Sequence, residues 1–223
     1  MSRTSQADKR RTLNAQKITE AAIELADSQG IEALSMRKLA TQLGVTAMSI
    51  YNHVANKDDL LSLMLDHVVS EFERPQIKGD WQETMRRRAH SMRQAFLRHP
   101  WAPPLLISTI TNGEQTMRDT DATLGCLINA GFTYAAADWA RNAIDSHIYG
   151  YTMQELNFPV EPDEYKAAAA HYLPMIEKSD FPYLHGATLA LVNGEYDGVT
   201  QFDFGLNLLL EGLARQLQSG QLS

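Results

Sequence analysis

The sequence has a single cysteine and no long apolar segment. Cys126 has no second cysteine within the 223 residues with which to form a disulfide bond, and this is typical of proteins in a reducing compartment. The charged N-terminus is not followed by the apolar run of a signal peptide, and no run reaches the roughly 18 apolar residues needed to cross a bilayer. We therefore expect a cytoplasmic protein with no membrane partner.

Motifs that carry catalysis or bind metal ions are missing too. The sequence contains no Glu-x-x-His or His-Glu-x-x-His pair, no Gly-x-Ser-x-Gly and no phosphate-binding glycine loop. His67 and Glu71 stand four apart, as two ligands on one helix would, but a single pair is weak evidence. Asp145 and His147 are two apart, so a helix directs them to different sides. We therefore expect no enzyme, no metal site and no cofactor.

Positive charge is scarce overall but not at the N-terminus. The chain has a formal charge of −7, yet residues 1–57 have eight Lys and Arg against five Asp and Glu, a balance of +3. Residues 58–223 have a balance of −10. A basic N-terminal part favours phosphate binding through counterion release, and an acidic remainder stays off DNA.

A helix-turn-helix pattern occupies residues 35–57, SMRKLATQLGVTAMSIYNHVANK. Ser35 is suited to cap a first helix, and Gly44 supplies the left-handed residue with which a helix often ends. Thr46 can then cap a second helix over residues 47–53. Two helices joined by a short turn with glycine make a helix-turn-helix, whose second helix enters the major groove of DNA.

The outward faces of these two helices carry residue types that contact DNA. Asn52 can bond an adenine edge in two places, and Arg37 can pair with guanine or phosphate. A merely solvated helix would more often carry Glu and Lys, although spacing alone leaves a plain three-helix core open. The candidate DNA-contacting residues are Arg37, Thr46, Ala47, Met48, Ser49, Tyr51, Asn52, His53 and Lys57.

Residues 21–61 of this sequence resemble the DNA-binding domain of the tetracycline-repressor (TetR) family. The segment QFDFGLNLLLEGLARQL, residues 201–217, also resembles the last helix of the tetracycline-repressor branch. The resemblance implies an all-α protein with an N-terminal three-helix DNA-binding domain and a C-terminal helical bundle for ligand binding and dimerisation. The matching positions are Ile18, Ala22, Leu25, Ala26, Gly30, Leu34, Arg37, Leu39, Ala40, Leu43, Gly44, Val45, Tyr51, His53, Val54, Lys57 and Leu60.

We divide the chain into residues 1–59, an N-terminal arm and DNA-binding domain; 60–78, a connecting helix and linker; and 79–223, a ligand-binding and dimerisation domain. Asn56 can cap the connecting helix, whose apolar pattern on more than one side predicts contacts with both domains. The basic cluster Lys9, Arg10 and Arg11 belongs either to a solvated tail or to an arm that lies along DNA.

Helices are expected through the rest of the chain, and no strand. The expected helix over residues 81–98 contains three consecutive arginines, Arg86, Arg87 and Arg88. At least two of three consecutive helical residues face outward, so we expect this run to be solvated. Residues 105–110 are too few to assign by periodicity. The expected helices span residues 15–29, 81–98, 114–130, 134–156, 163–178, 181–193 and 199–218.

The last of these helices has a broad apolar stripe with two glycines seven apart. Each interior glycine costs a helix about 1 kcal/mol relative to alanine, and close approach of another backbone would explain both. Packing on its own chain is the alternative. The family resemblance implies a four-helix homodimer interface made by this helix and residues 134–156 of two chains. The candidate interface residues are Phe202, Gly205, Leu206, Leu209, Gly212 and Leu213.

The resemblance also implies a small-molecule site inside the helical body. Leu106 stands where a magnesium-binding histidine of the tetracycline repressor is expected, a second pocket histidine falls near Glu73, and only Glu155 keeps the acidic type there. We therefore expect an effector other than magnesium–tetracycline, and a fairly hydrophobic one. The candidate lining residues, each also an ordinary core type, are Met64, His67, Met92, Phe96, Trp101, Leu106, Thr109, Trp139, Asn142, Ser146 and Tyr149.

These observations predict a ligand-responsive regulator of transcription, specifically a repressor that binds a palindromic operator as a homodimer and is released by a small hydrophobic effector. An activator or a ligand-independent regulator of the same fold is the alternative. For the body alone a helical protein–protein adaptor also stays open, but that class does not explain Arg37, Tyr51 and Asn52.

Overall fold

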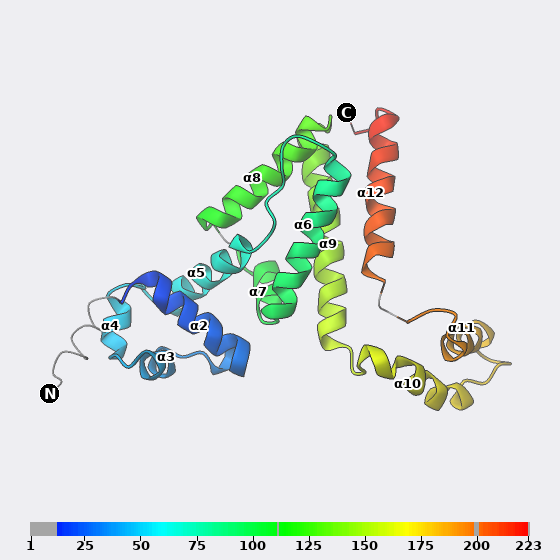
Figure 1. Cartoon of the computed structure of the whole chain (residues 1–223), viewed down its shortest axis with the longest axis horizontal. Coiled ribbons are helices and arrows are strands. Elements are labelled where there is room, and N and C mark those ends of the chain that lie inside the picture. Colours follow the sequence, from blue (N-terminus) through cyan, green and yellow to red (C-terminus); the bar gives the residue numbers. More distant parts are fainter. Residues whose placement is uncertain (1–12, 111, 199–200, 223) are drawn as a thin grey trace.

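The computed structural model describes residues 13–110, 112–198 and 201–222, and within these ranges every regular element is a helix (Figure 1). The prediction of an all-α fold is therefore confirmed. Lys9, Arg10 and Arg11 lie outside the described residues. The first elements are α2 (Ala15–Gln29), η1 (Ile31–Ala33), α3 (Met36–Leu43), α4 (Ala47–Tyr51) and α5 (Lys57–Ser70).

The head, which we define as α2, α3 and α4, forms where its capping residues predict. Ser35 accepts a hydrogen bond from the Lys38 amide at 3.2 Å, and Thr46 accepts one from the Ser49 amide at 3.3 Å. Gly44 ends α3 in the left-handed conformation, with φ of 66°, which costs glycine nothing. The local sequence thus sets both helices and the turn between them.

The second helix of the motif is shorter than the predicted span of residues 47–53. It ends at Tyr51, and the His53 and Val54 amides both donate to the Ile50 carbonyl in a tight turn. This turn returns Val54 to the core, where it is buried with Ile50. The burial of Val54 therefore replaces two further helical residues, Asn52 and His53, with a turn.

The connecting helix α5 packs on both sides, as its apolar pattern predicts. It contacts α2 in the head, and in the body it contacts α7 (Ala102–Ser108) and α8 (Glu114–Asn129). Leu60, Met64, Leu65, Val68 and Val69 are all buried. A movement of α5 therefore changes contacts in the head and in the body together.

The body, which we define as α6 to α9 and α12, is built around α6 (Trp81–Arg98) and α9 (Tyr134–Asn157), which lie side by side (Figure 1). Residues 102–108 form a helix, and its two prolines stand in the first turn, where no amide hydrogen bond is lost. Helices α8 and α12 both pack on α9. The bounds are α6 (Trp81–Arg98), α7 (Ala102–Ser108), α8 (Glu114–Asn129), α9 (Tyr134–Asn157) and α12 (Phe202–Gln218).

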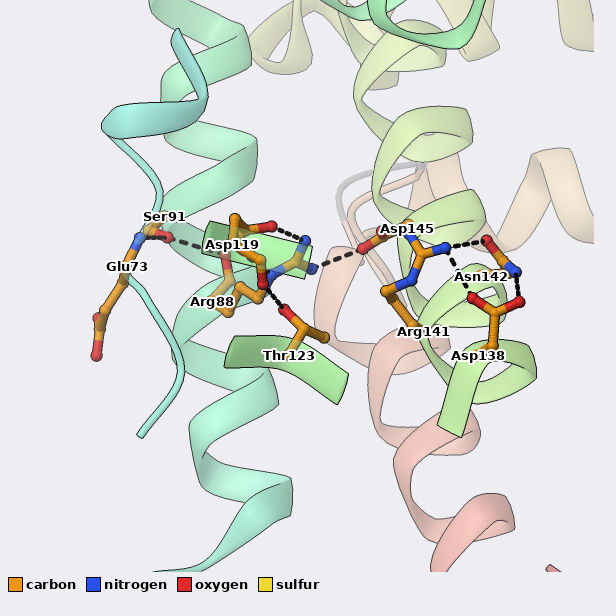
Figure 2. A network of polar contacts seen from close by, with 9 residues as sticks. All are labelled: Glu73, Arg88, Ser91, Asp119, Thr123, Asp138, Arg141, Asn142 and Asp145. Atoms are coloured by element: carbon orange, nitrogen blue, oxygen red, sulfur yellow. Dashed lines mark hydrogen bonds and ion pairs between the residues drawn. The ribbon is translucent and has the colours of Figure 1, made fainter. Parts of the chain in front are cut away.

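A buried ionic network joins α6, α8 and α9 inside the body (Figure 2). Arg88 is only 3% exposed, which corrects the expectation of a solvated arginine run. Its guanidinium donates to both oxygens of Asp119 at 3.2 and 2.7 Å and to Asp145 at 2.6 Å. Arg141 donates to the second Asp145 oxygen at 3.4 Å and to Asp138 at 2.9 Å. The network ties three helices together at one point.

The arm, which we define as residues 158–198, leaves the end of α9 and projects away from the rest of the body (Figure 1). It holds η2 (Pro162–Glu164), α10 (Tyr165–Tyr172), η3 (Leu173–Met175) and α11 (Pro182–Asn193). The helix predicted for residues 163–178 is broken here, because Pro174 lies in η3 and cannot donate an amide hydrogen bond. Helices α10 and α11 pack on each other.

Within the described ranges, no helix is both long enough and apolar enough to cross a membrane.

Candidate DNA-reading and effector sites

The candidate DNA-reading surface is the outer side of the helix-turn-helix. Ile50 points into the head core, whereas Met48 and Tyr51 are 71% and 46% exposed. Both side chains are therefore accessible to a partner surface. Asn52 and His53 are exposed in the turn that follows α4.

Most of the predicted DNA-contacting side chains lie at the surface of the head or at the start of α5. Arg37 lies in the first turn of α3 and Lys57 in the first turn of α5, and both are exposed. Ala47 and Ser49 are half-buried, and the Ser49 hydroxyl is 2.9 Å from that of Thr46. The arrangement offers an exposed apolar helix followed by an amide in the next turn, with a cation in the first turn of each neighbouring helix. These groups are suited to contact bases and phosphates. Contact with DNA remains a prediction.

A charged junction connects the head to the body, and the sequence reasoning missed it. We define it as Asp27 of α2, Glu71 at the end of α5, and Arg98, His99 and Trp101 at the corner between α6 and α7. His99 is 7% exposed, with Nδ1 at 2.9 Å from Asp27 Oδ1 and Nε2 at 3.1 Å from Glu71 Oε1. No periodic signal marks such a group, because its members come from distant parts of the chain.

Trp101, which was predicted to line the effector pocket, lies in this junction. Its indole N–H donates to Asp27 Oδ1 at 2.6 Å. A buried indole needs a partner for its N–H, and the carboxylate of α2 is that partner. The ring therefore serves the contact between head and body.

A second link between α5 and the body is made by Asp66. Its carboxylate accepts from the Gln115 and Thr116 amides at 3.2 and 2.9 Å, so it caps the start of α8. A β-carbon on Gly113 would come within 2.1 Å of the Asp66 side chain, so any other residue here would force Asp66 to move. Neighbouring His67, predicted to line the effector pocket, instead lines an open polar groove of about 330 Å³ between α2, α5 and α8.

Four of the predicted pocket residues lie in or against the packed core of the protein. Met64, Met92 and Phe96 are fully buried. Phe96 stacks on Tyr149 with ring centroids 5.1 Å apart and meets Phe72 edge to face at 5.5 Å. Burial, followed by the nearby Asp145 carboxylate, raises the pKa of Tyr149 well above its ordinary value. An effector here would have to displace or reorder these rings.

Three others point out of the body, which corrects their assignment to an internal pocket. Trp139 is 67% exposed, and Asn142 and Ser146 are exposed on the same side of α9. The reason is helical periodicity: α9 buries Ala140, Ile144 and other positions on its opposite face. Of the remaining two, Leu106 is half-buried against the core and Thr109 is exposed at the end of α7.

The final helix uses much of its predicted dimer stripe within its own chain. Phe202 and Leu206 are buried, and a β-carbon on Gly205 would come within 2.5 Å of the His147 ring of α9. The missing side chain of Gly205 thus admits α9 of the same chain. Gly212 has no atom within 4 Å of such a carbon. Leu209 and Leu213 are half-buried, and Phe204 and Leu208, which were not in the prediction, are exposed.

The arm contains an apolar cavity that the sequence reasoning did not anticipate. Its volume is about 530 Å³, within the range of small-molecule sites. Alanines at positions 168, 169 and 187 leave the space between α10 and α11 unfilled. The larger lining side chains include Phe158, Tyr165, Tyr172, Leu184, Leu191 and Tyr196.

Glu155, the one acidic residue kept from the tetracycline-repressor metal site, is paired with an arginine. Glu155 forms a bidentate ion pair with Arg93, one of whose contacts is 2.9 Å long. In the described part of the chain, no group of three His, Cys, Asp or Glu side chains is placed to hold a metal ion.

Comparison with known proteins gives two family matches that together cover most of the chain. Residues 18–64 match the family described as bacterial regulatory proteins, tetR family, and residues 75–217 match the tetracyclin repressor-like C-terminal domain. The transcriptional repressor DrrR1 of Streptomyces coeruleorubidus is 30% identical over 91% of this chain and 77% of its own. The class D tetracycline repressor of Escherichia coli is 27% identical over 92% of this chain and 91% of its own.

Solved structures of a TetR family protein are also similar to this chain. ActR of Streptomyces coelicolor in complex with actinorhodin has a TM-score of 0.76 and 26% identity, covering 95% of this chain and 100% of its own. ActR in complex with (S)-DNPA has a TM-score of 0.76 and 28% identity, with 91% and 98% covered.

Proposed function

This chain belongs to the TetR family of bacterial regulatory proteins, and from that premise we propose that it is a cytoplasmic repressor that binds a palindromic operator as a homodimer. A small hydrophobic effector releases it from DNA. The observation that carries the proposal is the exposed surface of α4, where Met48 and Tyr51 stand out from the head beside Asn52.

DNA contact divides between bases and backbone. Helix α4 lies in a major groove, where the Asn52 amide is suited to bond an adenine edge. Arg37 and Lys57, each in the first turn of a neighbouring helix, contact guanine or phosphate and set the register. Two heads about 34–36 Å apart then read the halves of a palindrome, which one five-residue helix could not discriminate alone.

The dimer forms through α9 and α12. Trp139 on α9 and Phe204 and Leu208 on α12 are exposed apolar side chains that a second copy would cover. Gly212 supports close approach, because the space above it is open. The opposite side of α12 packs on its own chain through Phe202, Gly205 and Leu206. This packing determines which side of α12 faces the second copy.

The effector is a fairly hydrophobic compound. The ActR complexes with actinorhodin and (S)-DNPA support an organic ligand, and the pairing of Glu155 with Arg93 argues against a magnesium–tetracycline complex here. The core around Met64, Met92, Phe96 and Tyr149 is the proposed site. A compound that separates the Phe96 and Tyr149 rings would also disturb the edge-to-face contact of Phe96 with Phe72, two residues beyond the end of α5. It would thereby shift α5, which packs on both domains.

The test is selection of bound sequences from a random duplex pool, followed by binding to the enriched sequence at several salt concentrations. We expect a palindrome and an affinity that falls steeply with salt. A chain with Arg37 and Tyr51 replaced by alanine is the matched control, because both side chains are exposed and their loss leaves the head core intact. Failure to enrich any sequence would refute the proposal. If an operator is selected, compounds that dissociate its complex with the protein would identify the effector class.

A further inference from the structure

The charged junction between head and body is centred on His99. This residue caps the C-terminus of α6, where its amide donates to the Ala95 carbonyl. Its ring lies between a carboxylate of the head, Asp27, and a carboxylate of the connecting helix, Glu71. This one residue therefore links α2, α5 and α6, whose relative position determines where the head lies.

The two contacts of this ring bear on which of its nitrogens carry protons. Nδ1 is 2.9 and 3.0 Å from the two Asp27 oxygens, and Nε2 is 3.1 Å from Glu71 Oε1. An ionised carboxylate only accepts hydrogen bonds, and a neutral imidazole has one N–H and one lone pair. A neutral His99 would aim its lone pair at one of the carboxylates. Both contacts are favourable only when both ring nitrogens carry protons.

The other charged groups at the junction support an imidazolium. Arg98 pairs with Glu71 on the side away from His99, and the Trp101 indole donates to Asp27. Burial by itself would raise the pKa of Glu71, but hydrogen bonds from Arg98 and His99 outweigh it and hold that pKa below its ordinary value. The C-terminus of α6 also favours a positive charge at its cap.

We propose that His99, held as an imidazolium between Asp27 and Glu71, is a pH-sensitive positioning residue that fixes the head to the body. The proposal rests on the function proposed above, because the readout of head position is operator binding. When the ring loses its proton, repulsion between its lone pair and Asp27 or Glu71 loosens α2. A loose head pays more ordering entropy on binding DNA, so operator affinity falls as pH rises.

The first experiment reads the ring directly and needs no DNA. In the full-length protein labelled with ¹⁵N in its histidine rings, we expect His99 to show two protonated nitrogens at about pH 6 to 7, where exposed histidines titrate. The His99→Gln variant identifies its signals. A neutral single tautomer over this range would overturn the proposal, whatever the protein binds.

The second experiment measures affinity for the selected operator at about pH 6 and about pH 8.5, on either side of the ordinary histidine range. Asp27→Asn is the informative variant, because an amide of the same shape can donate to a neutral Nδ1 and keep the junction closed at both pH values. We expect wild-type affinity to fall about fivefold, the low end of couplings between distant sites. Asp27→Asn should change much less, and His99→Gln should bind weakly at both.

The matched control is His90→Gln. His90 lies on the same helix and pairs with Asp203 at 2.8 Å, but that pair links α6 to α12 and not to the head. Its pH profile should match that of the wild type, including any contribution from His53 on the reading surface. Equal profiles for wild type and Asp27→Asn would overturn the proposal. If the wild type selects no operator, the proposed function fails, and the ring experiment still decides the state of His99.

Discussion

Replacing Arg88 by methionine should destabilise the body severely, because the arginine neutralises two aspartates that water barely reaches. The side chains of Arg88, Asp119 and Asp145 are 3%, 9% and 13% exposed. Methionine has a similar length and fills the space, so the change removes the charge and its three hydrogen bonds to the two aspartates without opening a large cavity. Asp145 keeps Arg141 at 3.4 Å, whereas Asp119 loses its cation.

The expected loss is about 3–5 kcal/mol, the usual cost of leaving one partner of a buried ion pair without its countercharge. In a chain of this size each kcal/mol moves the unfolding midpoint by about 2–4 °C, so we expect a fall of about 6–20 °C. Arg88→Met combined with Asp119→Leu should recover part of this loss. The double variant removes the carboxylate that would otherwise be stranded, and apolar replacements of buried pairs are often tolerated.

Thermal unfolding followed by circular dichroism measures the effect, with Arg87→Met as the control. Arg87 is the neighbour of Arg88 on α6, but its side chain is 41% exposed and its pairs with Glu73 and Glu83 lie in solvent. Exposed pairs contribute little, so this variant should unfold close to the wild type. If Arg88→Met and Arg87→Met shift the midpoint equally, the reasoning from burial is wrong.

Further predictions concern DNA, the dimer, α8 and a buried tyrosine. Asn52→Ala should weaken binding to the selected operator by about 1–3 kcal/mol while leaving binding to random duplex unchanged; an equal loss on both would make Asn52 a backbone contact. Gly212→Leu should yield monomers in sedimentation velocity, and an unchanged profile would place the interface elsewhere. Gly113→Ala should cost about 1–2 kcal/mol in thermal unfolding, because its β-carbon displaces the Asp66 cap, and an unchanged midpoint would contradict that cap. Burial raises the pKa of Tyr149, so the unfolded chain releases the phenol proton at a lower pH than the folded chain does. The stability contributed by the buried neutral phenol is therefore complete below about pH 10 and is lost as pH rises further. An ultraviolet titration in which all tyrosines ionise together would contradict this.

The local sequence determined the helices and the reading motif. Ser35, Thr46 and Asn56 cap helices with their own side chains, and Gly30 and Gly44 end helices with positive φ. These interactions span three or four residues, so they can be read directly from the order of the chain. The ends of α2 and α6 fall where predicted for the same reason.

Helical periodicity did not predict which neighbour covers each face of α9 and α12. The predicted pocket included Trp139, but α9 turns that ring outward. Gly205 was assigned to a partner chain, yet the His147 ring of its own chain occupies the space beside it. A stripe of apolar residues specifies that a face is covered and leaves the covering element open.

By itself, then, the sequence determined the all-helical class, the family and the reading head, because caps, turns and exposed residue types act over a few residues. Only the tertiary structure decided which of three consecutive arginines is buried and that His99 lies between two carboxylates. Arg88 depends on Asp119 and Asp145, and His99 depends on Asp27, 72 positions away in the chain. Such groups cost free energy when buried alone and become favourable only when folding brings their distant partners within hydrogen-bond distance.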